Sequence, residues 1–101
     1  MKLKLLIAAR TDAAGAIAYY NAQEPGLGAE FAAEVRKTIE RILQFPNAWT
    51  SVSKRVRRSQ INRFLYSVFY SLKNDLVVVI AVLHNHREPR PWQERLEEED
   101  F

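Results

Sequence analysis

The hydrophobic pattern of the chain predicts an α+β fold in which a helical hairpin packs on a mainly antiparallel sheet, in the order β-α-α-β-β-β. Apolar residues recur at helical spacing over about 28–45 and at every second position from Trp49 onward, and an uninterrupted apolar run occupies Leu76–Leu83. A chain of 101 residues can bury one hydrophobic core. We therefore expect a single domain over residues 1–96 and an acidic C-terminal tail over residues 97–101.

The first two elements are predicted to be a strand and a helix. Polar and apolar residues alternate from Lys2 and the segment closes with an apolar run to Ala8, which is typical of a strand. Thr11 or Asp12 can then cap a helix over about 12–22, because either side-chain oxygen can accept from the free amides of the first turn. Pro25 disfavours helix at the residue before it and so marks the end.

The second helix, over about 28–45, has the clearest pattern in the chain. Glu30 in its first turn and Arg41 in its last turn both interact favourably with the helix dipole, and Pro46 ends it. Because only a short Pro-Gly turn separates the two helices, we expect them to form an antiparallel hairpin. The apolar stripe of the second helix consists of Phe31, Val35, Ile39, Ile42 and Leu43.

Three strands are expected to complete the sheet. Val52–Ser59 and Ile61–Leu72 alternate with period two, and the second of these would carry Arg63 on one face and Tyr66 on the other. Residues 73–75 can make a hairpin turn. Leu76–Leu83 is apolar on both faces, as expected of a strand with neighbours on both sides.

The distribution of charge indicates an anionic partner. Residues 41–74 contain no acidic side chain. Like charges on neighbouring strands repel, so a cationic cluster is easier to explain if it binds nucleic acid or an acidic polypeptide, and charge alone does not distinguish the two. The cations of this segment are Arg41, Lys54, Arg55, Arg57, Arg58, Arg63 and Lys73.

Several other classes of protein are disfavoured. Without cysteine the chain has neither a disulfide nor a thiolate metal site, which suits a reducing cytoplasm. The longest apolar run, Leu76–Leu83, is too short to cross a bilayer, so no membrane partner is expected. No glycine-rich phosphate loop follows a strand, and His84 and His86 supply only two metal ligands, so we expect no cofactor and no metal.

An enzymatic alternative would use the same cations. A metal-free ribonuclease needs cations to stabilise the transition state, together with a base and an acid. The tyrosines Tyr66 and Tyr70 fit core positions with hydroxyls at the rim better than they fit this role. Trp92 can stack on a base, although stapling the C-terminal segment onto the sheet fits it better. The candidate catalytic residues of a nuclease are therefore Arg57, Arg63, His84, His86 and Arg87.

Taken together, these motifs resemble the RelE/ParE superfamily of bacterial type II toxins over essentially the whole chain, and most closely its ParE-like branch. The matching residues are Tyr19-Tyr20, Pro25-Gly26-Leu27-Gly28, Phe31, Arg57-Arg58, Arg63-Phe64-Leu65-Tyr66 and the closing His84, Arg87, Pro89, Trp92 and Arg95. The resemblance implies the β-α-α-β-β-β fold and a ParD/RelB-like antitoxin, encoded beside the toxin, that neutralises it in a hetero-oligomer.

Two departures from the superfamily bear on activity. Nucleases of the RelE branch tend to place an arginine directly after the tyrosine of the third strand, where this chain has Ser67 after Tyr66, and a tyrosine near the C-terminus, where this chain has Pro91-Trp92. The resemblance therefore favours a ParE-like inhibitor that binds DNA gyrase over an enzyme, with a ribosome-dependent mRNA endonuclease as the alternative. The residues expected to contact the target are Arg87, Arg90, Trp92 and Arg95.

The expected antitoxin contacts combine apolar anchors with ion pairs. An antitoxin tail is expected to lay apolar side chains beside Leu27, Phe31 and Val35. Its carboxylates are expected to reach cations on the neighbouring strands. Ion pairs at a solvated rim contribute roughly 0–1 kcal/mol each, so most of the affinity should come from the apolar anchors. The cations assigned to this contact are Lys54, Arg57 and Arg63.

Overall fold

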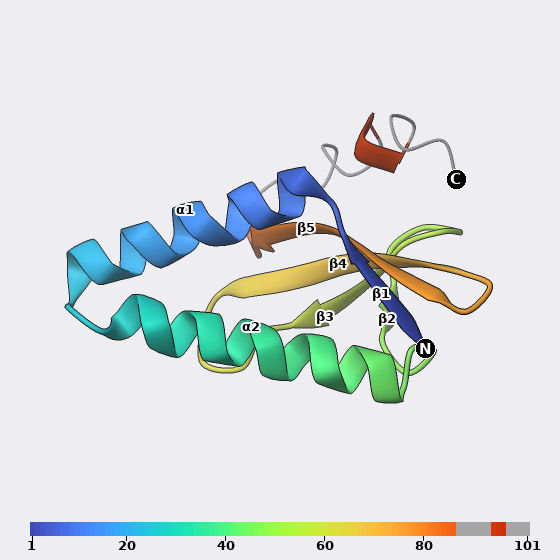
Figure 1. Ribbon diagram of the computed structural model, residues 1–101, viewed down its shortest axis with the longest axis horizontal. Coiled ribbons are helices and arrows are strands. Elements are labelled where there is room, and N and C mark those ends of the chain that lie inside the picture. The colour runs from blue at the N-terminus through green and yellow to red at the C-terminus, as the bar shows by residue number, and fades with distance from the viewer. Residues whose placement is uncertain (87–93, 97–101) are drawn as a thin grey trace.

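A helical hairpin covers one face of a five-stranded sheet (Figure 1). This computed structural model describes residues 1–86 and 94–96, so the acidic tail at 97–101 lies outside the described residues. The expected α+β architecture and the antiparallel hairpin are confirmed. The elements in chain order are β1 (Lys2–Leu5), α1 (Ile7–Gln23), α2 (Leu27–Gln44), β2 (Thr50–Ser51), β3 (Arg57–Gln60), β4 (Tyr66–Lys73) and β5 (Leu76–His84).

The strand order across the sheet is β1-β5-β4-β3-β2, in which β1 runs parallel to β5 and the other neighbours are antiparallel. The apolar strand β5 therefore has a neighbour on each side, as its continuous hydrophobic run predicts. Asn74 and Asp75 form the expected tight turn between β4 and β5. Within the part of the chain described, no helix is both long and apolar enough to cross a bilayer.

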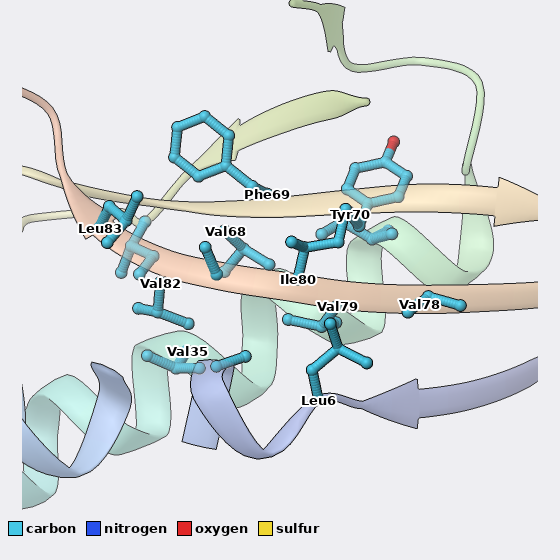
Figure 2. Close-up of a cluster of buried hydrophobic side chains, with 14 of the residues drawn as sticks. Leu6, Val35, Val68, Phe69, Tyr70, Val78, Val79, Ile80, Val82 and Leu83 are labelled. Atoms are coloured by element: carbon cyan, nitrogen blue, oxygen red, sulfur yellow. The ribbon is translucent and has the colours of Figure 1, made fainter. Parts of the chain in front are cut away.

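The core lies between the helical hairpin and strands β4 and β5. Figure 2 shows Leu6 and Val35 facing these strands from the helical side. Tyr70 and Ile80 on the strands are fully buried, with 0% of their surface exposed. Residues 67–71 of β4 and 77–83 of β5 are buried without interruption, so both faces of these two strands are covered.

Helix α1 begins at Ile7, about one and a half turns earlier than the sequence predicts. The expected caps are wrong, because Thr11 Oγ1 donates to the carbonyl of Ile7 within the helix and the Asp12 carboxylate bonds to β5. The residue before the helix, Leu6, has no side-chain cap and is buried, which anchors the helix start by packing instead. Ala8 and Ala9 favour helix and extend it backward.

The expected strand over Val52–Ser59 forms only from Arg57 onward, as β3, because residues 52–56 make a turn; the short strand β2 lies just before the expected range. The backbone N–H groups of Val52 and Ser53 both donate to the carbonyl of Val56, at 2.9 and 3.2 Å. Val56 has only 1% of its surface exposed, so packing of its side chain holds this turn closed. The fold class is unchanged by this shortening of the strand.

The expected strand over Ile61–Leu72 begins later than predicted, at Tyr66. The N–H of Ile61 donates to the carbonyl of Tyr66 at 2.8 Å and closes a turn before the strand. Arg63 lies in this turn with φ of 73°, a left-handed conformation that strands do not use. The placement of Arg63 on a strand is therefore wrong.

Candidate functional site

An aromatic cluster fixes the end of the helical hairpin against the sheet. The ring centroids of Tyr20, Phe31 and Phe64 lie 5.0–5.2 Å apart, and Tyr66 is 5.2 Å from Phe31. Such ring pairs are favourable beyond their area of contact. Phe31 has 0% of its surface exposed, so its side chain lies inside this cluster.

Two histidines extend the cluster at the end of β5. The His84 ring lies 5.3 Å from the Tyr66 ring and 5.3 Å from the His86 ring. His84 Nδ1 accepts from the backbone N–H of His86 at 3.2 Å, which leaves Nε2 as the nitrogen that can carry a proton. Among residues 1–86 and 94–96, no group of three or more metal-ligating side chains occurs.

The position after Tyr66 is closed to solvent. Ser67 has 0% of its surface exposed, and its hydroxyl donates to the side-chain carbonyl of Asn85 at 2.6 Å. Burial raises the pKa of the nearby Tyr20 hydroxyl, and the Tyr66 and Tyr19 hydroxyls raise it further. The Ser67 hydroxyl is thus buried and bonded to a neutral partner.

The candidate catalytic residues do not all come together. In the β3–β4–β5 ladder Arg57 pairs with Tyr70, whereas His84 pairs with Tyr66. Four residues along a strand correspond to about 13 Å. Arg57 is therefore well separated from the histidines, while Arg87 lies outside the described residues. Of the expected catalytic residues of a nuclease, the structure brings His84 and His86 together but holds Arg57 apart from them.

The other expected site cations have separate environments. Arg63 pairs with Glu30 at 2.9 Å, and both side chains are 53% exposed. The Arg63 guanidinium also lies 5.5 Å from the centre of the Phe64 ring. Lys54 is exposed in the turn between β2 and β3. These two cations remain at the surface, where an anionic partner can reach them.

Of the four residues expected to contact the target, Arg90 and Trp92 lie, like Arg87, outside the described residues. Arg95 donates to both oxygens of Asp12, at 2.7 and 3.1 Å, and to the carbonyl of Ile80 at 3.0 Å. Asp12 also accepts from the backbone N–H of Val82 at 3.0 Å. Arg95 thus links residues 94–96 to α1 and β5.

An apolar groove opens between the two helices where they cross β5. It encloses about 230 Å³, and α1 contributes mainly the small side chains Ala9, Ala13 and Ala14. These alanines are too small to fill the space opposite Val35. Val35 is the only one of the three expected apolar anchors that lines the groove; Leu27 is half-buried elsewhere on α2. The alanine-rich composition of α1 was the signal that could have located this groove in the sequence.

Comparisons with known proteins agree with this architecture. The model of the family described as "ParE toxin of type II toxin-antitoxin system, parDE" matches residues 3–89. A solved structure titled "Chromosomal ParDE TA system from P. aeruginosa" contains a chain similar in fold, with a TM-score of 0.74. The two chains are 17% identical, and the match covers 83% of this chain and 95% of that chain. A search of curated proteins found no match.

Proposed function

The chain belongs to the ParE toxin family of type II toxin-antitoxin systems, and from this membership we propose that it arrests growth by binding and poisoning DNA gyrase. The observation that carries the proposal is the family match, which spans residues 3–89. Gyrase acts on DNA in the cytoplasm, so the proposed site of action is there. In this proposal the toxin acts by binding and needs no cofactor.

The geometry around β4 supports inhibition by binding. Catalysis of RNA cleavage needs cations within reach of the acid and the base at the same phosphate. Arg57 instead lies about 13 Å along the sheet from His84, estimated from the strand rise. It also donates to the carbonyls of Asn47 and Trp49, at 3.2 and 2.7 Å. These bonds hold the Arg57 guanidinium beside residues 47–49, away from the histidines.

We further propose that a cognate ParD/RelB-like antitoxin neutralises the toxin in a hetero-oligomer by placing apolar side chains in the α1–α2 groove. The groove is lined almost wholly by aliphatic groups, including Val35 and Ile39, with Arg10 as its one charged lining residue. An amphipathic segment with a carboxylate at its edge would match both features. Most of the affinity is assigned to the buried apolar anchors.

A supercoiling assay tests the proposal for gyrase. Purified toxin is added to gyrase and relaxed plasmid, and we expect loss of supercoiling or accumulation of cleaved DNA. Normal supercoiling at saturating toxin would refute gyrase as the target. The antitoxin encoded beside the toxin gene, added in a second arm, should restore supercoiling.

A matched pair of variants tests the groove in the same assay. Ala14 lines the groove and is exposed, whereas Ala18 is exposed on α1 but does not line it. Ala14→Gln should still inhibit gyrase but should need about tenfold more antitoxin, because a long side chain blocks an anchor site. Ala18→Gln should behave like the parent chain. Equal neutralisation of both variants would remove the groove from the antitoxin interface.

One observation favours the alternative function of a ribosome-dependent mRNA endonuclease. The His84 ring centroid lies 5.3 Å from that of Tyr66 and 5.3 Å from that of His86, so candidate acid and base groups gather at one end of β5. Primer extension on cellular mRNA after induction separates the two functions. Cuts at fixed codon positions within minutes would support the nuclease, whereas intact mRNA with an induced DNA-damage response supports gyrase.

A further inference from the structure

A polar pocket lies at the turn between β2 and β3. It encloses about 230 Å³. Its polar lining residues are Asn47, Ser51, Ser53, Lys54, Arg55 and Arg57. Amide, hydroxyl, ammonium and guanidinium groups are those that proteins use to hold phosphate oxygens. The chemistry of the lining therefore favours an anion.

The turn that forms the pocket is held rigidly by its own hydrogen bonds. Ser53 Oγ accepts from the backbone N–H groups of Arg55 and Val56, at 3.3 and 3.2 Å. The carbonyl of Val56 accepts two further backbone N–H groups across the turn. A site whose geometry is already fixed loses little conformational entropy when it binds.

Two side chains of the sheet hold the loop that contributes Asn47 to the pocket. Arg57 Nη1 donates to the carbonyls of Asn47 and Trp49, and the Tyr70 hydroxyl donates to the carbonyl of Pro46 at 2.6 Å. These three bonds hold residues 46–49 against β3 and β4. The pocket is thus formed by two short segments that the sheet keeps in place.

Two of the three cations that line the pocket form no ion pair among the described residues. Within residues 1–86 and 94–96, no carboxylate pairs with Lys54 or Arg57, and both hydrogen-bond acceptors of Arg57 are neutral carbonyls. The sequence has no acidic residue from 41 to 74. An anion entering the pocket would therefore meet Lys54 and Arg57 without competition from a bound carboxylate.

We propose that this pocket binds a phosphodiester group of duplex DNA, so that the toxin contacts nucleic acid directly. An acidic polypeptide is the competing occupant, since it carries the same charge. Peptide affinity rests on buried apolar anchors, and the apolar residues of the lining are only Val56, which is 1% exposed, and Leu72. A polar, cationic lining without an accessible apolar anchor suits the nucleic-acid backbone better.

The position of the pocket makes this contact compatible with a second partner. β2 and β3 lie at one end of the strand order and β1 and β5 at the other. The apolar groove is lined by Leu5 of β1 and by Val79 and Val82 of β5. A chain whose groove is filled would therefore still expose the pocket to DNA. The inference does not rest on gyrase being the target.

Fluorescence anisotropy with a labelled random-sequence DNA duplex, in the absence of gyrase, tests the proposal. Lys54→Glu changes a pocket cation, and Arg36→Glu makes the same change of charge at an exposed position of α2 that does not line the pocket. We expect Lys54→Glu to weaken binding about tenfold more than Arg36→Glu does. It should also reduce the slope of log affinity against log salt by about 1, the loss expected for one phosphate contact.

Circular dichroism must first show that both variants keep the parent fold. Equal weakening of DNA binding by the two substitutions would overturn the proposal, because the affinity would then depend only on the net charge of the protein. A labelled poly-glutamate peptide supplies the competing arm. If it binds the parent chain more tightly than the duplex does, and loses that binding in Lys54→Glu, the pocket takes an acidic polypeptide and the DNA proposal is wrong.

Discussion

Tyr70 combines a fully buried ring with a hydroxyl that holds a loop in place. The ring has 0% of its surface exposed, and the hydroxyl donates to the carbonyl of Pro46 at 2.6 Å. The sequence predicts a core position for this tyrosine because it alternates with other apolar residues, and that prediction is confirmed. The partner of the hydroxyl, 24 residues away in sequence, has no local signal.

The protonation of Tyr70 predicts a loss of stability at high pH. Burial raises the pKa of Tyr70 from 10.0 to about 12, although the Arg57 charge acts in the opposite direction. The folded state holds the Tyr70 proton more tightly than the unfolded chain does, so protonation of Tyr70 adds to the free energy of unfolding. This contribution is full below pH 10.0 and is lost as pH rises through about 12. Two pKa units correspond to roughly 2–3 kcal/mol.

Urea unfolding of the parent chain and of Tyr70→Phe between pH 7 and pH 12 measures this contribution. We expect Tyr70→Phe to cost about 1 kcal/mol at pH 7, for the lost hydrogen bond. It should then lose less stability than the parent between pH 10 and 12. Tyr20, whose pKa is also raised, is present in both proteins and cancels in the difference. Parallel declines in the two proteins would show that Tyr70 does not titrate as described.

At the scale of elements, close contact of the two helices depends on Gly28. A Cβ atom there would lie 2.5 Å from the carbonyl oxygen of Ile17 and 2.6 Å from Cγ of Asn21. The N–H of Gly28 also donates to Asn21 Oδ1 at 2.8 Å. The hairpin therefore needs a residue without a side chain at the point where α2 begins against α1.

Alanine substitutions at two glycines should have opposite effects on stability. Gly28→Ala should lower the free energy of unfolding by about 2 kcal/mol, because backbone and amide atoms must move apart. Gly15 lies on the exposed face of α1, where a Cβ atom would meet nothing within 4 Å beyond its chain neighbours and the backbone of its own helix. Gly15→Ala should raise the free energy of unfolding by about 0.5–1 kcal/mol. Thermal unfolding compares both with the parent, and a loss in both would contradict the packing described.

The elements that the sequence predicts well are those with a long, unambiguous period. α2 lies within one residue of its expected bounds, and β5 matches its apolar run. The start of α1 is missed because a short run of leucine, isoleucine and alanine suits a strand and a helix equally. The turn at 61–65 contains neither glycine nor proline, so nothing local announces the left-handed Arg63. Glu34 of α2 is buried with 7% of its surface exposed, although a charged residue type favours the solvated face of a helix.

At the scale of the whole molecule, the candidate sites depend on residues far apart in sequence. The charge of the pocket is evident in the sequence as a segment without acidic residues, but the shape of the pocket depends on a turn at residues 52–56, where the sequence predicts a strand. The groove combines residues of α1, α2, β1 and β5. Among its lining residues, only Val35 was expected from the sequence to contact an antitoxin. Periodicity predicts which residues share a face of one element. It does not predict where two elements leave space between them.

The Asp12–Arg95 pair joins residues 83 positions apart and provides a test of this long-range organisation. Their side chains are only 11% and 19% exposed, and Asp12 also accepts from the N–H of Val82, beyond the point where β1 ends beside β5. The carboxylate thus accepts a hydrogen bond from a backbone N–H of β5 at a point where β1 no longer runs beside that strand. A neutral side chain at position 12 would leave the Arg95 charge partly buried and without its partner.

Asp12→Asn should therefore lower the free energy of unfolding by about 2–4 kcal/mol, measured in urea at neutral pH. The control is Glu30→Gln, which breaks the pair with Arg63, in which both side chains are 53% exposed, and should cost at most about 0.5 kcal/mol. Both substitutions remove one negative charge and nearly preserve side-chain volume, so the difference between them reports burial and geometry. If the two variants lose equal stability, Asp12 does not anchor residues 94–96 to α1 and β5. If only Asp12→Asn is destabilised, toxicity changes in Arg95 variants must be corrected for folding before that arginine is assigned a contact with the target.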